Sequence, residues 1–257
     1  MRLFLAGASG VVGSRLVPLL TRAGYDVFGT TRSPAKAKVL QSADVQPVIV
    51  NVFDAARLEE IMIAVRPAII IHQLTDLPRG LDPNQMEEAI KRNALIRAEG
   101  THNLISAARK AGARRIIAQS IAWAYAPGAE PHVEEDPLDL HTEGSRAISV
   151  GGVAALEQAV LNSPPLEGVV LRYGHIYGPG TGVSGPAGVP SLHVDAAAWA
   201  AFLAIDKARS GVFNIAEPNQ YVCSSKAMTQ LGWDADFRLE EAMIPAPLSE
   251  DPLDPRS

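Results

Sequence analysis

Three glycines near the start of the sequence have a spacing that suits phosphate binding. Gly7, Gly10 and Gly13 form a G-x-x-G-x-x-G loop between an apolar run, Arg2–Ala6, and an amphipathic run, Val11–Ala23. Glycines permit a tight turn and close backbone approach, and a helix N-terminus presents free N–H groups to a pyrophosphate. A plain strand–helix turn is the alternative, but the position between strand and helix favours a dinucleotide-binding loop. Its residues are Gly7, Ala8, Ser9, Gly10, Val11, Val12 and Gly13.

The residues after the second predicted strand, Asp26–Thr30, bear on which dinucleotide is bound. NAD-preferring sites usually end this strand with an Asp or Glu that accepts a hydrogen bond from the ribose 2′-hydroxyl. Here the strand is followed by Thr31, Arg32 and Ser33. Arg32 can form a bidentate pair with a 2′-phosphate, assisted by Ser33 and Lys36, whereas a solvated cation is the alternative interpretation. The sequence therefore favours NADP(H) over NAD(H).

Strand-like and helix-like runs alternate through the first two-thirds of the chain, and these elements must position the loop. Such alternation implies right-handed β-α-β units and a parallel sheet covered by helices on both faces. We predict an α/β fold of the Rossmann type, with a doubly wound parallel sheet. The expected strands are Arg2–Ala6, Asp26–Thr30, Val45–Val50, Ala68–His72, Arg115–Ala118 and Val169–Arg172. The expected helices are Val11–Ala23, Pro34–Leu40, Ala55–Val65, Pro83–Ala111 and Thr142–Leu161.

The composition excludes several classes of partner. With 47% hydrophobic and 20% charged residues, the 257-residue chain resembles ordinary globular proteins. Its net charge of −5 argues against nucleic acid and anionic membranes, which select basic surfaces. The single cysteine, Cys223, excludes an intramolecular disulfide and fits a reducing compartment, so we expect a cytoplasmic protein. The apolar start could be a signal peptide, but the turn at Gly7 favours a first strand.

Further segments occur in a recognisable order along the chain. They are NVFD at 51–54, PAIIIHQLTD at 67–76, the run at 93–120, VVLRYGHIYGPG at 169–180, and the runs at 191–205 and 211–219. With the glycine loop, they resemble the short-chain dehydrogenase/reductase superfamily, specifically its extended branch, the NAD-dependent epimerase/dehydratases. The resemblance covers residues 1 to about 218. It implies cofactor contacts from Asn51, Val52 and Asp54 at the adenine, Gln73 and Leu74 at the ribose, and Ser120 and Tyr173 near the nicotinamide.

The acid–base pair of that family is missing from this sequence. The family places a Tyr and a Lys at Y-x-x-x-K, so that both point from one helix face toward the nicotinamide. Aligning on Glu157 puts Ser149 at the Tyr position and Val153 at the Lys position. A shifted alignment does not restore the pair, because there is no lysine at 111–206 and no tyrosine at 126–172.

Other side chains remain as catalytic candidates. Ser120 matches the family's catalytic serine, with capping of a strand end as the alternative. Tyr125 matches a tyrosine near the substrate pocket and could donate a proton, although packing is the more conservative interpretation. His175 titrates near neutrality without help and could be an acid, or a hydrogen-bonded loop residue. Arg146 could supply a cation near the same helix face. No histidine has a metal-ligand spacing with acids or cysteines, so we predict no metal.

Two glycines in the last predicted helix, Gly151 and Gly152, require an explanation because glycine costs about 1 kcal/mol relative to alanine inside a helix. They suggest close approach by a cofactor, a substrate or a partner helix. A helix that starts later than Thr142 is the alternative.

The substrate side is shorter than in the extended family, since only residues 180–193 stand where family members carry a sizeable insertion. We predict one domain over 1–257, a small substrate lobe from about 178–193 and 217–245, and a flexible tail at 246–257. The family analogy suggests a homodimer through the helices at 83–111 and 142–161.

Three functions remain open for a small-molecule substrate. The first is hydride transfer to or from a carbonyl-type compound with non-standard acid–base residues. The second is a non-catalytic NADP(H)-binding sensor or regulatory protein. The third is a nucleotide-sugar epimerase or dehydratase.

Overall fold

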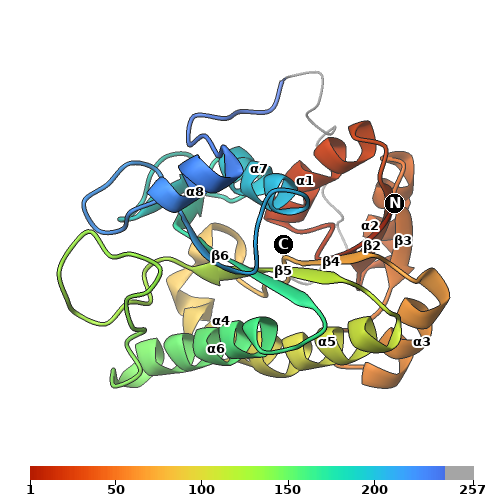
Figure 1. The fold of residues 1–257 in the computed structure, drawn as a ribbon, viewed down its shortest axis with the longest axis horizontal. Coiled ribbons are helices and arrows are strands. Elements are labelled where there is room, and N and C mark those ends of the chain that lie inside the picture. Colours follow the sequence, from red (N-terminus) through yellow and green to blue (C-terminus); the bar gives the residue numbers. More distant parts are fainter. Residues whose placement is uncertain (241–257) are drawn as a thin grey trace.

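A parallel sheet of seven strands forms the centre of the structure, a computed structural model that describes residues 1–240 and, at Arg79, the backbone only (Figure 1). The strand order is β3-β2-β1-β4-β5-β6-β9. Because the order reverses between β1 and β4, the crevice where such folds bind ligands lies at the carboxyl ends of these strands. The strands are β1 (Arg2–Ala6), β2 (Asp26–Thr31), β3 (Gln46–Ile49), β4 (Ile69–His72), β5 (Arg115–Ile121), β6 (Glu167–Tyr173) and β9 (Gly211–Ile215). A second, two-stranded sheet pairs β7 (His175–Tyr177) with β8 (Ser191–His193).

Helices cover both faces of the sheet, which confirms the predicted doubly wound α/β fold (Figure 1). One buried apolar cluster joins α1 and α7 to the sheet, and a second joins α3, α5 and α6 to the opposite face. The helices are α1 (Val11–Arg22), α2 (Pro34–Ser42), α3 (Ala55–Val65), α4 (Pro83–Leu95), α5 (Thr101–Lys110), α6 (Gly144–Leu161), α7 (Val194–Ala204) and α8 (Ser225–Leu231). A short 3-10 turn, η1, spans Arg79–Leu81.

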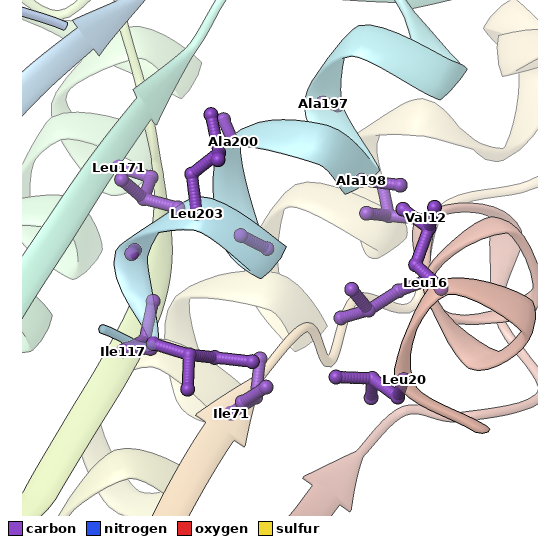
Figure 2. Close-up of a cluster of buried hydrophobic side chains, with 14 of the residues drawn as sticks. Val12, Leu16, Leu20, Ile71, Ile117, Leu171, Ala197, Ala198, Ala200 and Leu203 are labelled. Carbon is purple, nitrogen blue, oxygen red and sulfur yellow. The ribbon is translucent and has the colours of Figure 1, made fainter. Parts of the chain in front are cut away.

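Alanines let α7 lie close to α1 and the sheet. Ala196, Ala197, Ala198, Ala200 and Ala201 are fully buried, and alanine combines the highest helix propensity with a small side chain. Figure 2 shows Ala198 of α7 beside Val12 of α1, and apolar side chains of β4, β5 and β6 belong to the same cluster. This packing fixes α1, and therefore the glycine loop before it, against the sheet.

One expected helix is interrupted. The helix predicted over Pro83–Ala111 consists of α4 and α5, joined by a π-helical segment, η2 (Ile96–Gly100). At Gly100 a Cβ atom would lie 3.1 Å from the Val52 side chain, so this glycine lets the helix approach the segment after β3 closely. Such π segments often occur at functional sites.

The two glycines of α6 have different surroundings. A Cβ atom on Gly152 would lie 2.9 Å from the Ala94 Cα, so this glycine lets α4 and α6 approach closely. Gly151 is exposed, with no atom within 4 Å of a Cβ built there. The helix α6 begins at Gly144, two residues later than the predicted start at Thr142, and still contains both glycines, so a later start does not account for them. The close approach of α4 explains Gly152.

The predicted substrate lobe stays a prediction. Its first part, 178–193, contains β8, and its second part contains α8. Residues 241–245 of this lobe and the predicted tail, 246–257, lie outside the described residues. Within residues 1–240, no helix is both long and apolar enough to cross a membrane.

Candidate cofactor-binding and active site

The glycine loop forms a tight cradle at the end of β1. Gly7 has φ +90°, and a Cβ atom there would lie 2.8 Å from the Gln73 carbonyl oxygen, so a larger residue does not fit. A Cβ atom on Gly13 would collide with the carbonyl oxygens of Gly7 and Ala8. Gly10 is exposed and caps α1 through its backbone alone. The loop therefore needs glycine at 7 and 13 for its shape, and at 10 it leaves backbone open to solvent.

The helix start behind this loop suits an anion. In the described structure no side chain caps the N-terminus of α1, and its first turn contains no acid. The first N–H groups of a helix lack helical partners and carry a partial positive charge. With Gly10 and Val11 exposed, this cradle fits the diphosphate of a dinucleotide.

Hydroxyl groups at the end of β2 hold the loop in place. The Gly7 N–H donates to Thr30 Oγ1 at 3.0 Å, and Ser9 Oγ donates to Thr31 Oγ1 at 3.2 Å. Thr31 also accepts from the Ser33 N–H, and the Ser33 hydroxyl caps α2 by accepting from the Lys36 N–H. Thr31 and Ser33 therefore stabilise the glycine loop and the start of α2. Their role as cofactor ligands stays a prediction.

The predicted adenine-side residues form hydrogen bonds within the protein. Asn51 Oδ1 accepts from the Phe53 N–H at 3.2 Å. Asp54 Oδ1 accepts from the Arg57 N–H at 3.0 Å and so caps α3. The Val52 carbonyl accepts from Asn103 Nδ2. These contacts shape the segment after β3, and adenine binding by its residues stays a prediction.

A buried acceptor without a partner lies at the switch point. Gln73, which follows β4, is 4% exposed, and its Oε1 has no hydrogen-bond partner among the described residues. Its Nε2 donates to the Tyr173 hydroxyl at 3.4 Å, and that hydroxyl donates to the Ala197 carbonyl. Leaving such an acceptor unpaired costs about 1–3 kcal/mol, which a donor on a bound ligand would remove. The Gln73 amide thus fits a ligand in this crevice.

The Ser120 hydroxyl is hydrogen-bonded to a buried ion pair. Its hydroxyl donates to Glu157 Oε1 at 2.7 Å, and the side chain is fully buried. Glu157 also pairs with Arg172, which lies beside Ser120 in the register of β5 and β6. Orienting a substrate oxygen, the role predicted for Ser120, would require this hydrogen bond to break.

Tyr125 has the contacts of a packing residue. Its hydroxyl donates to Asn214 Oδ1 at 2.7 Å, its ring stacks on His132, and the Arg172 guanidinium lies 4.8 Å from its centroid. Burial raises the pKa of Tyr125 to about 12. The phenol therefore keeps its proton near neutral pH.

His175 begins β7, two residues after β6, and lies beside the segment that follows β5. It is half-buried, and its ring stacks on Trp123 with centroids 5.3 Å apart and planes 4° from parallel. Burial lowers the pKa of His175, so the imidazole is neutral at pH 7. Trp123, which the sequence analysis did not single out, thus covers one face of the His175 ring.

Comparisons with known proteins agree with this site. Residues 3–203 match the family described as the NAD dependent epimerase/dehydratase family. The chain belongs to this family. It is 39% identical over 238 residues to a 3-diazoavenalumate denitrifying reductase of a Streptomyces species, covering 84% of this chain and 76% of that protein. It is 28% identical over 205 residues to UDP-glucose 4-epimerase of Mycolicibacterium smegmatis, covering 76% of this chain and 63% of that protein.

Solved structures show the same fold. The UDP-glucose 4-epimerase of Thermotoga maritima, with UDP-glucose, superposes with a TM-score of 0.75 over 95% of this chain and 96% of that one, at 20% identity. The Bifidobacterium longum enzyme, in complex with NAD+ and UDP, gives a TM-score of 0.70 over 95% and 96% of the chains, at 18% identity. Membership of the family implies a nicotinamide dinucleotide and a small-molecule substrate.

The helix face that holds the family's Tyr and Lys has neither residue in this member. Val153, at the Lys position, is fully buried in a cluster with Ile121, Ala124 and Val150. Ser149, at the Tyr position, is also buried. Within the described structure, this face of α6 therefore lacks the acid–base pair on which the family's chemistry rests.

The cations near this face have other partners. Arg146 binds Asp139 and donates to the backbone carbonyls of Trp123 and Tyr125, so it holds the loop between β5 and α6. Arg97, in the π-helical segment, reaches the Ser149 carbonyl at 3.5 Å, and burial lowers its pKa to about 10. The sequence alone does not indicate Arg97, because its contact with Ser149 depends on how the π-helical segment packs against α6. Among residues 1–240, no group of three His, Cys, Asp or Glu side chains is placed to hold a metal ion.

Proposed function

We propose that this protein is an NAD(P)H-dependent reductase that delivers a hydride to a substrate carbon without a proton donor of its own. The observation that carries the proposal is the pairing of a complete phosphate cradle with an apolar α6 face, where Val153 lies among Ile121, Ala124 and Val150. A glycine cradle without a substrate site would be equally consistent with a non-catalytic sensor. The half-exposed Trp123–His175 surface beside the crevice favours a substrate site.

The residues that would hold the cofactor are those of the crevice. The backbone of residues 7–13 takes the diphosphate, Gln73 Oε1 accepts from the ribose or the amide group, and Arg32 takes a 2′-phosphate. We propose NADP(H) for this reason. Bound in its reduced form, the dinucleotide supplies a hydride.

The substrate that best suits this site is a compound whose reduction consumes no proton. Reduction of a carbonyl leaves an alkoxide that a general acid must protonate. Replacement of a diazonium group by hydride forms a C–H bond and breaks the C–N bond, whose electron pair leaves with N2, so no proton is needed. The 39% identity to a denitrifying reductase of a diazo compound supports this substrate class.

The aromatic surface at the site favours an aryl diazonium. The Trp123 and His175 rings stack on each other and are both partly exposed, so a flat aromatic ring can contact the parts that the pair leaves uncovered. A cation is attracted to the face of an indole. The neutral state of His175 avoids charge repulsion with such a substrate.

The carbonyl substrate predicted from the sequence is the second candidate, and His175 is the observation that favours it. Of the three predicted donors, only its side chain is more than a few per cent exposed. A neutral imidazole is, however, a weak acid at pH 7.

Isotope transfer tests the proposal. Purified protein is incubated with NADPH deuterated at either C4 position and with an aryl diazonium carboxylate, and N2 and the arene are measured by mass spectrometry. We expect one deuterium in the arene, from one of the two labelled forms, and none from D2O in a parallel reaction. Gly10→Asp, which places an anion at the phosphate cradle, controls for non-enzymatic reduction. Turnover of aldehydes or ketones without turnover of the diazonium would reject the substrate class.

The predicted homodimer remains a proposal with a defined surface. A groove lies on the surface between α4 and the start of α6. Ile148, one of its lining residues, is 39% exposed. The lining residues are Met86, Glu87, Ile90, Lys91, Ser145 and Ile148. Light scattering of Ile148→Glu against the unmodified protein tests it, and an unchanged mass would reject this interface.

A further inference from the structure

A carboxylate joins two arginines near the phosphate loop. Asp76 Oδ1 lies 3.4 Å from Arg32 Nη2, and Asp76 Oδ2 lies 3.0 Å from Arg92 Nε. The side chain of Asp76 is 15% exposed, whereas those of Arg32 and Arg92 are 54% and 47% exposed. The Asp76 N–H also donates to the buried Asn93 Oδ1 at 3.1 Å, which fixes the loop that carries the carboxylate.

The position of this bridge follows from the strand order. Arg32 comes directly after β2, and Asp76 lies in the loop after β4. Since β2 and β4 flank β1, the Arg32–Asp76 pair spans the carboxyl end of β1, where the phosphate loop begins. Because folds of this type contact the ribose 2′-hydroxyl from the end of β2, the Arg32 end of the bridge would lie beside the adenosine ribose of a bound dinucleotide.

We propose that Asp76 weakens the preference of the site for NADP(H) over NAD(H) by partly neutralising Arg32. This inference rests on the proposed function, because it concerns the same dinucleotide site. A 2′-phosphate carries nearly two negative charges and binds arginine through charge-assisted hydrogen bonds. Asp76 competes for the same guanidinium and repels the phosphate. A dinucleotide with a free 2′-hydroxyl has no such charge and does not depend on Arg32.

The inference predicts opposite behaviour from that of a ribose-binding acid. In NAD-preferring sites an Asp or Glu accepts from the 2′-hydroxyl, so its loss weakens NAD(H) binding. Asp76 follows β4 instead of β2, and Arg32 and Arg92 already occupy both of its oxygens. Loss of its charge should therefore strengthen NADP(H) binding and leave NAD(H) binding unchanged.

Calorimetric titration of NADPH and NADH into the full-length protein tests this directly. We expect Asp76→Asn to tighten NADPH binding about three- to fivefold, the range of a partly exposed ion pair, with NADH unchanged. Asp26→Asn is the matched control, because Asp26 pairs with Arg2 at 3.6 Å at the opposite end of β2. It should leave both affinities unchanged.

A double mutant separates action through Arg32 from a general charge effect. In an Arg32→Ala background, Asp76→Asn should bring no gain in NADPH affinity, since coupled residues give non-additive effects. A full gain in that background, a gain for NADH equal to that for NADPH, or a loss for NADH would overturn the inference while leaving the proposed function intact. Unmodified protein that binds neither dinucleotide would overturn both.

Discussion

The crevice at β1 and the nearby face of α6 belong to one candidate site, yet they differ in character. The crevice contains the glycine cradle, a helix start without a side-chain cap, and the Gln73 Oε1 atom, which has no hydrogen-bond partner among the described residues. All three offer polar groups to a ligand. The α6 face contains Val150 and Val153 packed on Ile121 and Ala124. The contrast indicates that the glycine loop of the family can be kept where the family's Tyr and Lys are lost.

The largest expected effect concerns the crevice. Gly10→Asp places a carboxylate at the exposed N-cap of α1, where it repels a diphosphate, so dinucleotide affinity should fall about a thousandfold. Aspartate is a favourable N-cap residue, so the helix should remain folded. Gly151→Asp, on the exposed side of α6, is the matched control, since Gly151 has helical backbone angles and no atom lies within 4 Å of a Cβ built there. Calorimetry with NADPH measures both, and equal affinities would remove the cradle from the site.

The next effect concerns the α6 face. Restoring the family's lysine with Val153→Lys buries an ammonium in an apolar cluster, and we expect a loss of about 3 kcal/mol of unfolding free energy. Gln158→Lys, on the exposed side of α6, should change stability by less than about 0.5 kcal/mol. Urea denaturation compares the two. If Val153→Lys is as stable as the control, the face is open to water and the contrast between the two regions fails.

A third test uses His72, the last residue of β4. His72 is buried, its Nε2 bonds the Thr101 hydroxyl and its Nδ1 accepts from the Leu74 N–H, and burial lowers its pKa from 6.5 to about 4. The unfolded chain therefore binds more protons between these two pKa values. Stability from this group is complete above pH 6.5 and is lost as the pH falls toward 4.

Between pH 7 and pH 5 this loss should amount to about 2 kcal/mol. Urea denaturation of the unmodified protein and of His72→Gln at both pH values measures it, because glutamine keeps a donor and an acceptor but does not titrate. An identical pH dependence in the two proteins would show that His72 is not the group responsible.

Local patterns were sufficient to predict β1 to β6 and the glycine loop, whereas β9 was indicated only by the family resemblance. Apolar runs and glycine spacing identify β1, β2 and the loop between β1 and α1 because those features are contiguous in sequence. The direction of Ser120 was not predictable in the same way, since its partner Glu157 lies on another element and their contact depends on how α6 packs. Asp76 and Arg97 were missed for the same reason, because their roles arise only when distant segments meet.

Tyr125 gives the smallest expected effect and the sharpest test of the α6 side. Tyr125→Phe removes the hydrogen bond to Asn214 and keeps the ring between Arg172 and His132, so we expect a stability loss of about 1 kcal/mol. If the phenol were the proton donor, kcat would fall by about a hundredfold or more. Because its pKa is raised to about 12 and its hydroxyl already has a partner, we expect kcat to change less than about threefold, with the same pH profile. Steady-state kinetics and thermal unfolding separate the two roles, and a large loss of kcat in a stably folded variant would return Tyr125 to the reaction.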